Sequence, residues 1–186
     1  MRKSGFTTFF LLVMLISAFR SAAHHYAGDH DHMPLEEFEW QAGLSRRVIT
    51  PQTNVWLAGY GTKRAPEGKL HDVWVKVLVL KDSKDRRRVL VTTDHQGMSK
   101  TIYQRLYQRV KKKFGIDQSA FMLTFSHNHS GPCLQDDLVD YYPSDSAQKA
   151  LVPEYTLWME DRIIDAVEEA WNNLRPVRLF KGEGIC

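Results

Sequence analysis

The amino-acid sequence predicts an α/β fold. The expected architecture is a mixed sheet with a β-α-β unit and a helix-rich flank, incomplete at its C-terminal end. Two strand-like runs, at 71–82 and 88–93, are separated by a short polar turn. A helical stripe over 99–114 and another apolar run over 120–126 follow. Strand, helix and strand in this order are typical of two parallel neighbouring strands joined by a crossover helix.

The first 23 residues have the organisation of a signal peptide. Arg2 and Lys3 form a basic start, residues 9–19 are apolar, and small residues end the segment at Ala23. We therefore expect cleavage after Ala23 and a secreted or extracytoplasmic protein. The alternative is a membrane anchor formed by residues 6–19, for which the apolar run is short.

Charge and composition restrict the class of protein. Hydrophobic residues make up 43% of the chain and aromatic residues 11%, which is typical of a globular protein. Cleavage would remove three basic residues and no acidic one, leaving 22 of each kind, so the net charge of +3 disappears. Overall charge therefore predicts no nucleic-acid partner. The two cysteines, Cys133 and Cys186, are too few for a disulfide framework, and whether they pair stays open.

Residues 24–40 are polar and contain four histidines, which predicts a flexible lead-in before a domain at 41–186. Such a tract can bind metal, but a solvated tail explains it as well. Residues 42–70 are broken by Gly and Pro, which predicts short extended pieces and turns.

The run over 71–82 alternates as a strand does, with four valines on one face: Val73, Val75, Val77 and Val79. With the run at 88–93 it predicts a hairpin. Ser99 is suited to cap the following helix and Gly115 to end it, and the apolar stripe between them comprises Ile102, Leu106, Val110 and Phe114. The basic residues over 105–113 suit either contact with an anionic membrane surface or a solvated helix face.

A second long helix is expected from Pro153, a favoured first helical residue, to Asn173. Its predicted buried stripe comprises Leu157, Ile164, Val167, Trp171 and Leu174. The residues from Pro176 onward are expected to begin a further strand.

The segment "TFSHNHSGP" over 124–132 contains the candidate catalytic and metal-binding residues. On a strand, His127 and His129 would share one face, with Asn128 opposite. Asp94 and His95 would end the neighbouring parallel strand at the same carboxyl edge, where ligands gather in open α/β sheets. The pattern predicts three imidazoles and a carboxylate together, a set suited to zinc and to proton transfer. The alternative is a polar strand end without function.

Five segments in fixed order resemble a known family: "AGLSRRVITP", "WLAGYGTKR", "HDVWVKVLVL", "VLVTTDHQGMS" and "TFSHNHSGP". The series is similar to the N-terminal domain of the neutral/alkaline non-lysosomal ceramidases, and it covers the chain from about Ala42 onward. Phe125 and Asn128 replace a small residue and a threonine of the family's pattern. Neither replacement removes an imidazole.

The resemblance implies a zinc amidase that cleaves the N-acyl bond of ceramide to sphingosine and a fatty acid. It implies that His127 ligates zinc and that His129 lies beside the reacting amide. The family's other zinc ligands, a histidine, a glutamate and a tyrosine, have no matching motif here. The resemblance also implies a structural Ca²⁺ or Mg²⁺ held by a backbone carbonyl, for which Leu70 is the nearest match.

Because several ligands of the family pattern have no match, we expect this chain to be the front portion of a family protein, incomplete and inactive by itself. Two alternatives stay open. One is a non-catalytic exported domain that binds metal, a lipid surface or a partner, and the other is a different zinc hydrolase that uses the same histidines. The sequence does not predict an oligomeric state.

Overall fold

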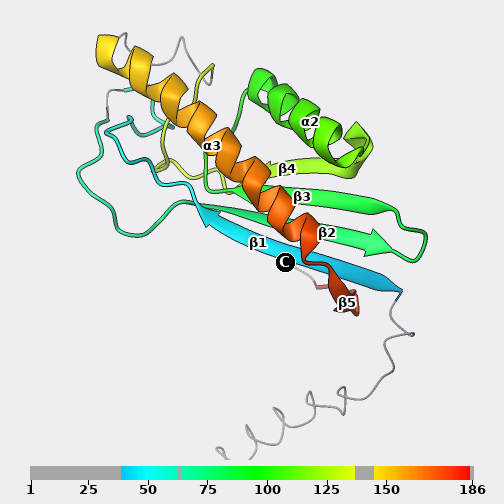
Figure 1. Cartoon of the computed structure of the whole chain (residues 1–186). Helices are drawn as coiled ribbons and strands as arrows, with labels where there is room; N and C mark the ends of the chain where they lie inside the picture. The colour runs from blue at the N-terminus through cyan, green and yellow to red at the C-terminus, as the bar shows by residue number, and fades with distance from the viewer. Residues whose placement is uncertain (1–38, 63, 137–144, 185–186) are drawn as a thin grey trace, which may run out of the picture. The chain divides into compact units, whose positions relative to one another are not determined.

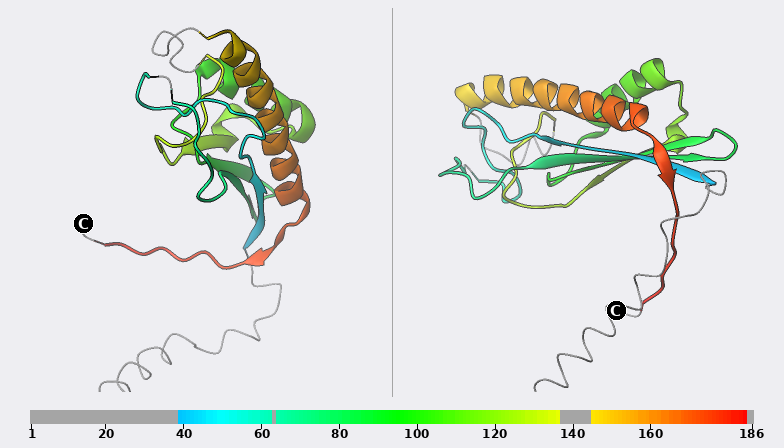
Figure 2. Two further views of the ribbon diagram at one scale, coloured as in Figure 1. Left: turned by 90° about the vertical axis from the view of Figure 1, so that its left-hand side faces the viewer. Right: turned by 60° about the horizontal axis from the view of Figure 1, so that its bottom comes forward.

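The structure is a computed structural model that describes residues 39–62, 64–136 and 145–184. Five strands form one mixed sheet in the order β4-β3-β2-β1-β5. Helices α2 and α3 lie on the same face of this sheet (Figures 1 and 2). The strands are β1 (Trp40–Val48), β2 (Trp74–Asp82), β3 (Arg87–Thr93), β4 (Phe121–Phe125) and β5 (Arg175–Val177), and the helices are α2 (Lys100–Phe114), the 3-10 helix η2 (Gln118–Ala120) and α3 (Ser146–Asn172).

The predicted hairpin and β-α-β unit are confirmed. β2 and β3 pair antiparallel, and β3 and β4 pair parallel with α2 crossing between them. The Ser99 hydroxyl accepts a hydrogen bond from the Ile102 amide, which satisfies one free N–H of the first helical turn. Gly115 ends the helix in the left-handed region at φ 69°, where glycine carries no steric penalty.

The expectation of short pieces and turns over 42–70 is wrong for its first part. Residues 40–48 form the nine-residue strand β1, which pairs antiparallel with β2 and with β5. Gly43 lets this strand lie directly under α3, because a Cβ there would meet the Ala170 carbonyl oxygen at 1.8 Å. The Asn173 side chain bonds both backbone groups of Leu44, so the end of α3 is tied to the strand.

The predicted start of the second long helix is also wrong. α3 begins at Ser146, and the Asp145 carboxylate caps it by accepting bonds from the amides of residues 147 and 148. Pro153 lies inside the helix, where it removes one backbone hydrogen bond. Leu157 of the predicted stripe is 54% exposed, whereas Ile164 and Val167 are buried as expected and Trp171 and Leu174 pack against the core.

The core lies between the sheet and the two helices. Valines of β2 and β3 point toward the helices, as their alternation predicts, and meet apolar residues of α2 and α3; the central members are Val75, Val77, Val79, Val89, Val91, Ile102, Leu106, Ile163 and Val167. The opposite face of the sheet carries the exposed side chains of Leu44 and Met122.

The predicted signal peptide at 1–23, nearly all of the lead-in at 24–40, and Cys186 lie outside the described residues. Trp40, assigned to the lead-in, instead begins β1. Among the helices that the structure describes, none is long and apolar enough to cross a membrane.

Candidate active site at the carboxyl ends of β3 and β4

The histidine pair lies just beyond β4. The strand ends at Phe125, and His127 adopts φ 54°, so the expectation that both histidines extend the strand is wrong. Their rings meet nonetheless: His129 Nε2 lies 3.5 Å from His127 Nε2, with the ring planes at 73°. A turn, and not the alternation of a strand, brings the two imidazoles together.

The protonation of His127 follows from its backbone partner. His127 Nδ1 lies 2.7 Å from the Gln96 carbonyl oxygen. A carbonyl only accepts hydrogen bonds, so Nδ1 carries the proton and Nε2 keeps its lone pair when the ring is neutral. An imidazole anchored in this way through one nitrogen presents the other as a metal ligand or proton acceptor. That nitrogen is the one that faces His129.

Asp94 and His95 do not join the pair as predicted. The Asp94 carboxylate accepts a hydrogen bond from the Trp74 amide at 2.9 Å, which ties the end of β3 to the start of β2. The Asp94 carbonyl accepts a bond from the Asn128 side chain at 2.7 Å. Asp94 therefore fixes the backbone around residues 126–132, which we call the histidine loop, and its carboxylate bonds β2 instead of the histidines.

His95 is fully buried and bonds Tyr155 of α3, with Nε2 3.0 Å from the hydroxyl oxygen. The Tyr155 hydroxyl donates to the Ile49 carbonyl at 2.7 Å, so His95 Nε2 is the donor to Tyr155. Burial lowers the pKa of His95 to about 3 and raises the pKa of Tyr155. The His95 ring is therefore neutral. Its hydrogen bond to Tyr155 connects the end of β3 to α3, which is a structural role.

A second loop forms one side of the site. We call residues 57–62 together with Arg64 the Gly59 loop. Its backbone joins the histidine loop through a bridge between Leu57 and Pro132 and a hydrogen bond from the Ala58 amide to the Gly131 carbonyl at 2.9 Å. This stretch is one of the segments that resemble the family, but no local pattern assigns it a role; its neighbouring glycines are the signal of close backbone approach.

Gly59 and Tyr60 contact His129 directly. Gly59 has φ 111°, and a Cβ there would lie 2.5 Å from His129 Cγ. The Tyr60 ring meets the His129 ring edge-on, with 5.0 Å between centroids. The imidazole of His129 is thus held between a bare backbone, an aromatic ring and His127.

Leu70 lies in the loop before β2, and its side chain is 99% exposed. Beside it, the Asp72 carboxylate accepts hydrogen bonds from Lys69 and Thr50, and these bonds lower the pKa of Asp72. The calcium or magnesium site that the resemblance implies at Leu70 stays a prediction.

The pair fits zinc only in part. Two imidazole nitrogens bound to one tetrahedral zinc lie about 3.3–3.4 Å apart, close to the 3.5 Å between His127 and His129. A catalytic zinc needs about three protein ligands. Within 39–62, 64–136 and 145–184, no group of three or more His, Cys, Asp or Glu residues is placed to hold a metal. The described residues therefore do not complete a zinc site.

Comparisons with known proteins give the family. Residues 40–185 match the family described as neutral/alkaline non-lysosomal ceramidase, N-terminal. No curated protein sequence matches the chain significantly.

Among solved structures, neutral ceramidase from Pseudomonas aeruginosa is similar, with 24% identity and a TM-score of 0.60. A ceramidase complexed with C2 has 25% identity and a TM-score of 0.59. Each match covers 75% of this chain and 22% of the other, so the chain spans about a fifth of the length of these relatives. Because the family match extends over most of the sequence, residues 40–185, the chain belongs to the neutral/alkaline non-lysosomal ceramidase family.

Proposed function

We propose that this chain provides part of the active site of a zinc-dependent amide hydrolase that cleaves the N-acyl bond of a ceramide-like lipid. The single observation that carries the proposal is the contact between His127 and His129, with His127 anchored on Gln96 so that its free nitrogen faces its partner. Membership of the ceramidase family supports the reaction class.

His127 is the proposed zinc ligand, through Nε2. The Gln96 carbonyl fixes the ring orientation and increases the basicity of that nitrogen. The remaining ligands would come from outside the described residues, since these do not form a complete set. When bound, zinc polarises an amide carbonyl and lowers the pKa of a coordinated water.

His129 is the proposed catalytic residue. Its Nε2 lies beside the free nitrogen of His127, so a group on the amide that reaches this point would be within range of both rings. A neutral imidazole there can donate a hydrogen bond to the developing oxyanion, or accept a proton from the attacking water and then pass it to the leaving nitrogen. Contacts from Gly59 and Tyr60 restrict the ring to this position.

A lipid amide is the proposed substrate class, supported by the family and by solved relatives that are ceramidases. The chain spans 22% of those relatives, so the pocket for the hydrocarbon chains would be built largely from other parts of a family protein. Export through a signal peptide at 1–23 is part of the same proposal, on the sequence pattern alone.

Metal analysis of the chain and two variants tests the assignment. His127→Ala should remove most of the zinc that the site retains, whereas His129→Ala should leave most of it. His71→Ala, at an exposed histidine in another loop, is the matched control. Equal loss in the two site variants would show that both imidazoles ligate, as their separation permits. Unchanged zinc in His127→Ala would contradict the proposed site.

A further inference from the structure

Arg64 connects the Gly59 loop to the backbone of His129. Its Nη1 donates to the His129 carbonyl at 2.8 Å and also lies 3.4 Å from the Ala58 carbonyl. The Arg64 carbonyl accepts a bond from the Leu57 amide at 2.8 Å, which closes the loop on itself. One half-buried side chain thus joins the two loops at the residue proposed to act on the amide.

The same guanidinium supports the ring that touches His129. Arg64 Cζ lies 4.6 Å from the centroid of the Tyr60 ring, a cation–π distance. Tyr60 meets the His129 ring edge-on. Arg64 therefore acts on His129 at two points: directly at its carbonyl, and through Tyr60 at its imidazole.

The orientation of His129 decides which of its nitrogens faces His127. In the metal-free chain His127 Nε2 carries a free lone pair, so the facing His129 Nε2 is expected to carry the proton when both rings are neutral. A ring free to rotate about its side-chain bonds would lose this preference. A catalytic group held only loosely gives up much of its effect.

We infer that Arg64 is a positioning residue, which fixes the orientation and tautomer of His129 through the His129 carbonyl and the Tyr60 ring. The inference rests on the proposed function for its catalytic meaning. The positioning of His129 can be measured without zinc, lipid or turnover. Failure of the positioning role is therefore distinguishable from failure of the proposed amide hydrolysis.

The test is the ¹⁵N imidazole spectrum of the whole chain at pH 8, where neutral rings report their tautomer. In the wild type, the two ring nitrogens of His129 should give well-separated signals with Nε2 protonated. Arg64→Met should collapse this separation toward a tautomer average, while His127, anchored on Gln96, keeps its own pattern. Arg64→Lys, which retains a cation and a donor, should restore part of the separation.

Arg88→Met is the matched control, because the Arg88 side chain is exposed and bonds only the neighbouring Arg87 carbonyl among the contacts described for it. It should leave both histidines unchanged. Tyr60→Leu removes the aromatic contact without touching the backbone bonds, and it should shift His129 in the same direction as Arg64→Met. Wild-type His129 signals in Tyr60→Leu, or in a folded Arg64→Met chain, would overturn the inference.

Discussion

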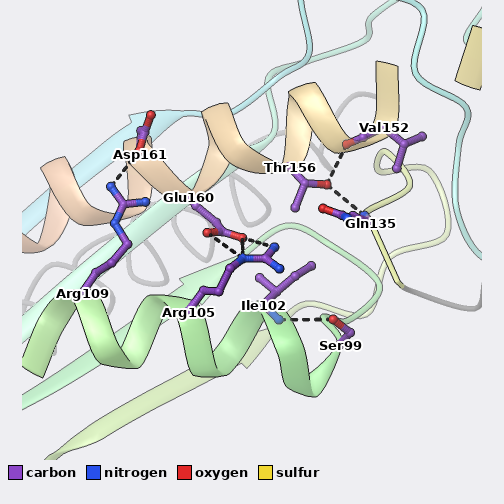
Figure 3. Close-up of polar contacts among 9 residues, drawn as sticks. All are labelled: Ser99, Ile102, Arg105, Arg109, Gln135, Val152, Thr156, Glu160 and Asp161. Carbon is purple, nitrogen blue, oxygen red and sulfur yellow. Dashed lines mark hydrogen bonds and ion pairs between the residues drawn. The ribbon is translucent and has the colours of Figure 1, made fainter. Parts of the chain in front are cut away.

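Glu160 on α3 accepts hydrogen bonds from both Nε and Nη2 of Arg105 on α2, at 3.0 and 2.5 Å (Figure 3). The Glu160 side chain is 2% exposed. One turn further along α2, Arg109 bonds Asp161, the residue after Glu160 on α3, at 2.7 Å, with both side chains exposed. The two pairs offer a direct comparison of buried and exposed ion pairs within one helix interface.

Arg105→Met should lower the free energy of unfolding by about 3–5 kcal/mol, because it leaves a buried carboxylate without its partner. Arg109→Met should cost less than about 1 kcal/mol, as exposed pairs do. Urea denaturation of both variants measures the difference. Adding Glu160→Met to Arg105→Met should recover most of the loss, and equal losses in the two single variants would contradict this account.

Acid should destabilise the fold through His95. Burial holds its pKa at about 3 in the folded state, below the usual 6.5. The unfolded chain therefore binds the extra proton, and stability is lost as pH falls from about 7 toward 3. Between pH 7 and pH 4, protonation of this imidazole in the unfolded chain should by itself lower the free energy of unfolding by about 3 kcal/mol.

His95→Gln, which retains a neutral donor toward Tyr155, should flatten this dependence between pH 7 and 4. The measurement is the free energy of unfolding at several pH values, with His71→Gln as the surface control. A variant that keeps the wild-type slope would show that other groups set the acid sensitivity.

Local patterns predicted most of the sheet and the first helix. Alternating valines on β2, the capping Ser99 and the terminal Gly115 each act within a few residues of sequence. β1 was missed because its glycine and its two arginines hide the alternation. Gly43 is required by the close approach of Ala170 on α3, a residue more than 120 positions away in the chain. The start of α3 was misplaced because Pro153 is as compatible with a first turn as with the interior position it occupies.

The candidate site is also predictable only in part, because local patterns report residues that are close in sequence. His127 and His129 were found because they are neighbours in sequence. Gly59, Tyr60 and Arg64, which support His129, lie 65 to 70 residues before it in the sequence, and only the fold brings them together. His95 and Asp94 end the correct strand, but their side chains serve packing and the backbone, which no local pattern distinguishes from a site.

Gly59→Ala should disturb the site more than an ordinary loss of glycine. The new Cβ would fall 2.5 Å from His129 Cγ, at a φ of 111° that L-residues rarely adopt. Gly115→Ala is the matched control, since Gly115 also has positive φ but open space around its Cβ position. The control should cost about 1–2 kcal/mol of stability through the left-handed backbone alone, and Gly59→Ala should cost about 1–3 kcal/mol beyond it through overpacking.

Only Gly59→Ala should also move the imidazole signals of His129, which a spectrum of each variant would show. Equal costs in the two variants, with unmoved His129 signals, would mean that the Gly59 loop adjusts freely and does not hold the ring.

The last prediction concerns zinc and turnover together. The described residues bring two imidazoles to one point, whereas a catalytic zinc needs about three protein ligands. We therefore expect residues 24–186 to bind zinc weakly and to release no measurable fatty acid from ceramide.

A chain starting at residue 39 is the necessary control, because the four histidines of the lead-in offer ligands of their own. In a longer family chain with a complete ligand set, His127→Ala should abolish hydrolysis and zinc retention, and His129→Ala should lower kcat while most zinc remains. Stoichiometric, tight zinc with turnover in residues 39–186 alone would show that a third ligand comes from this chain itself.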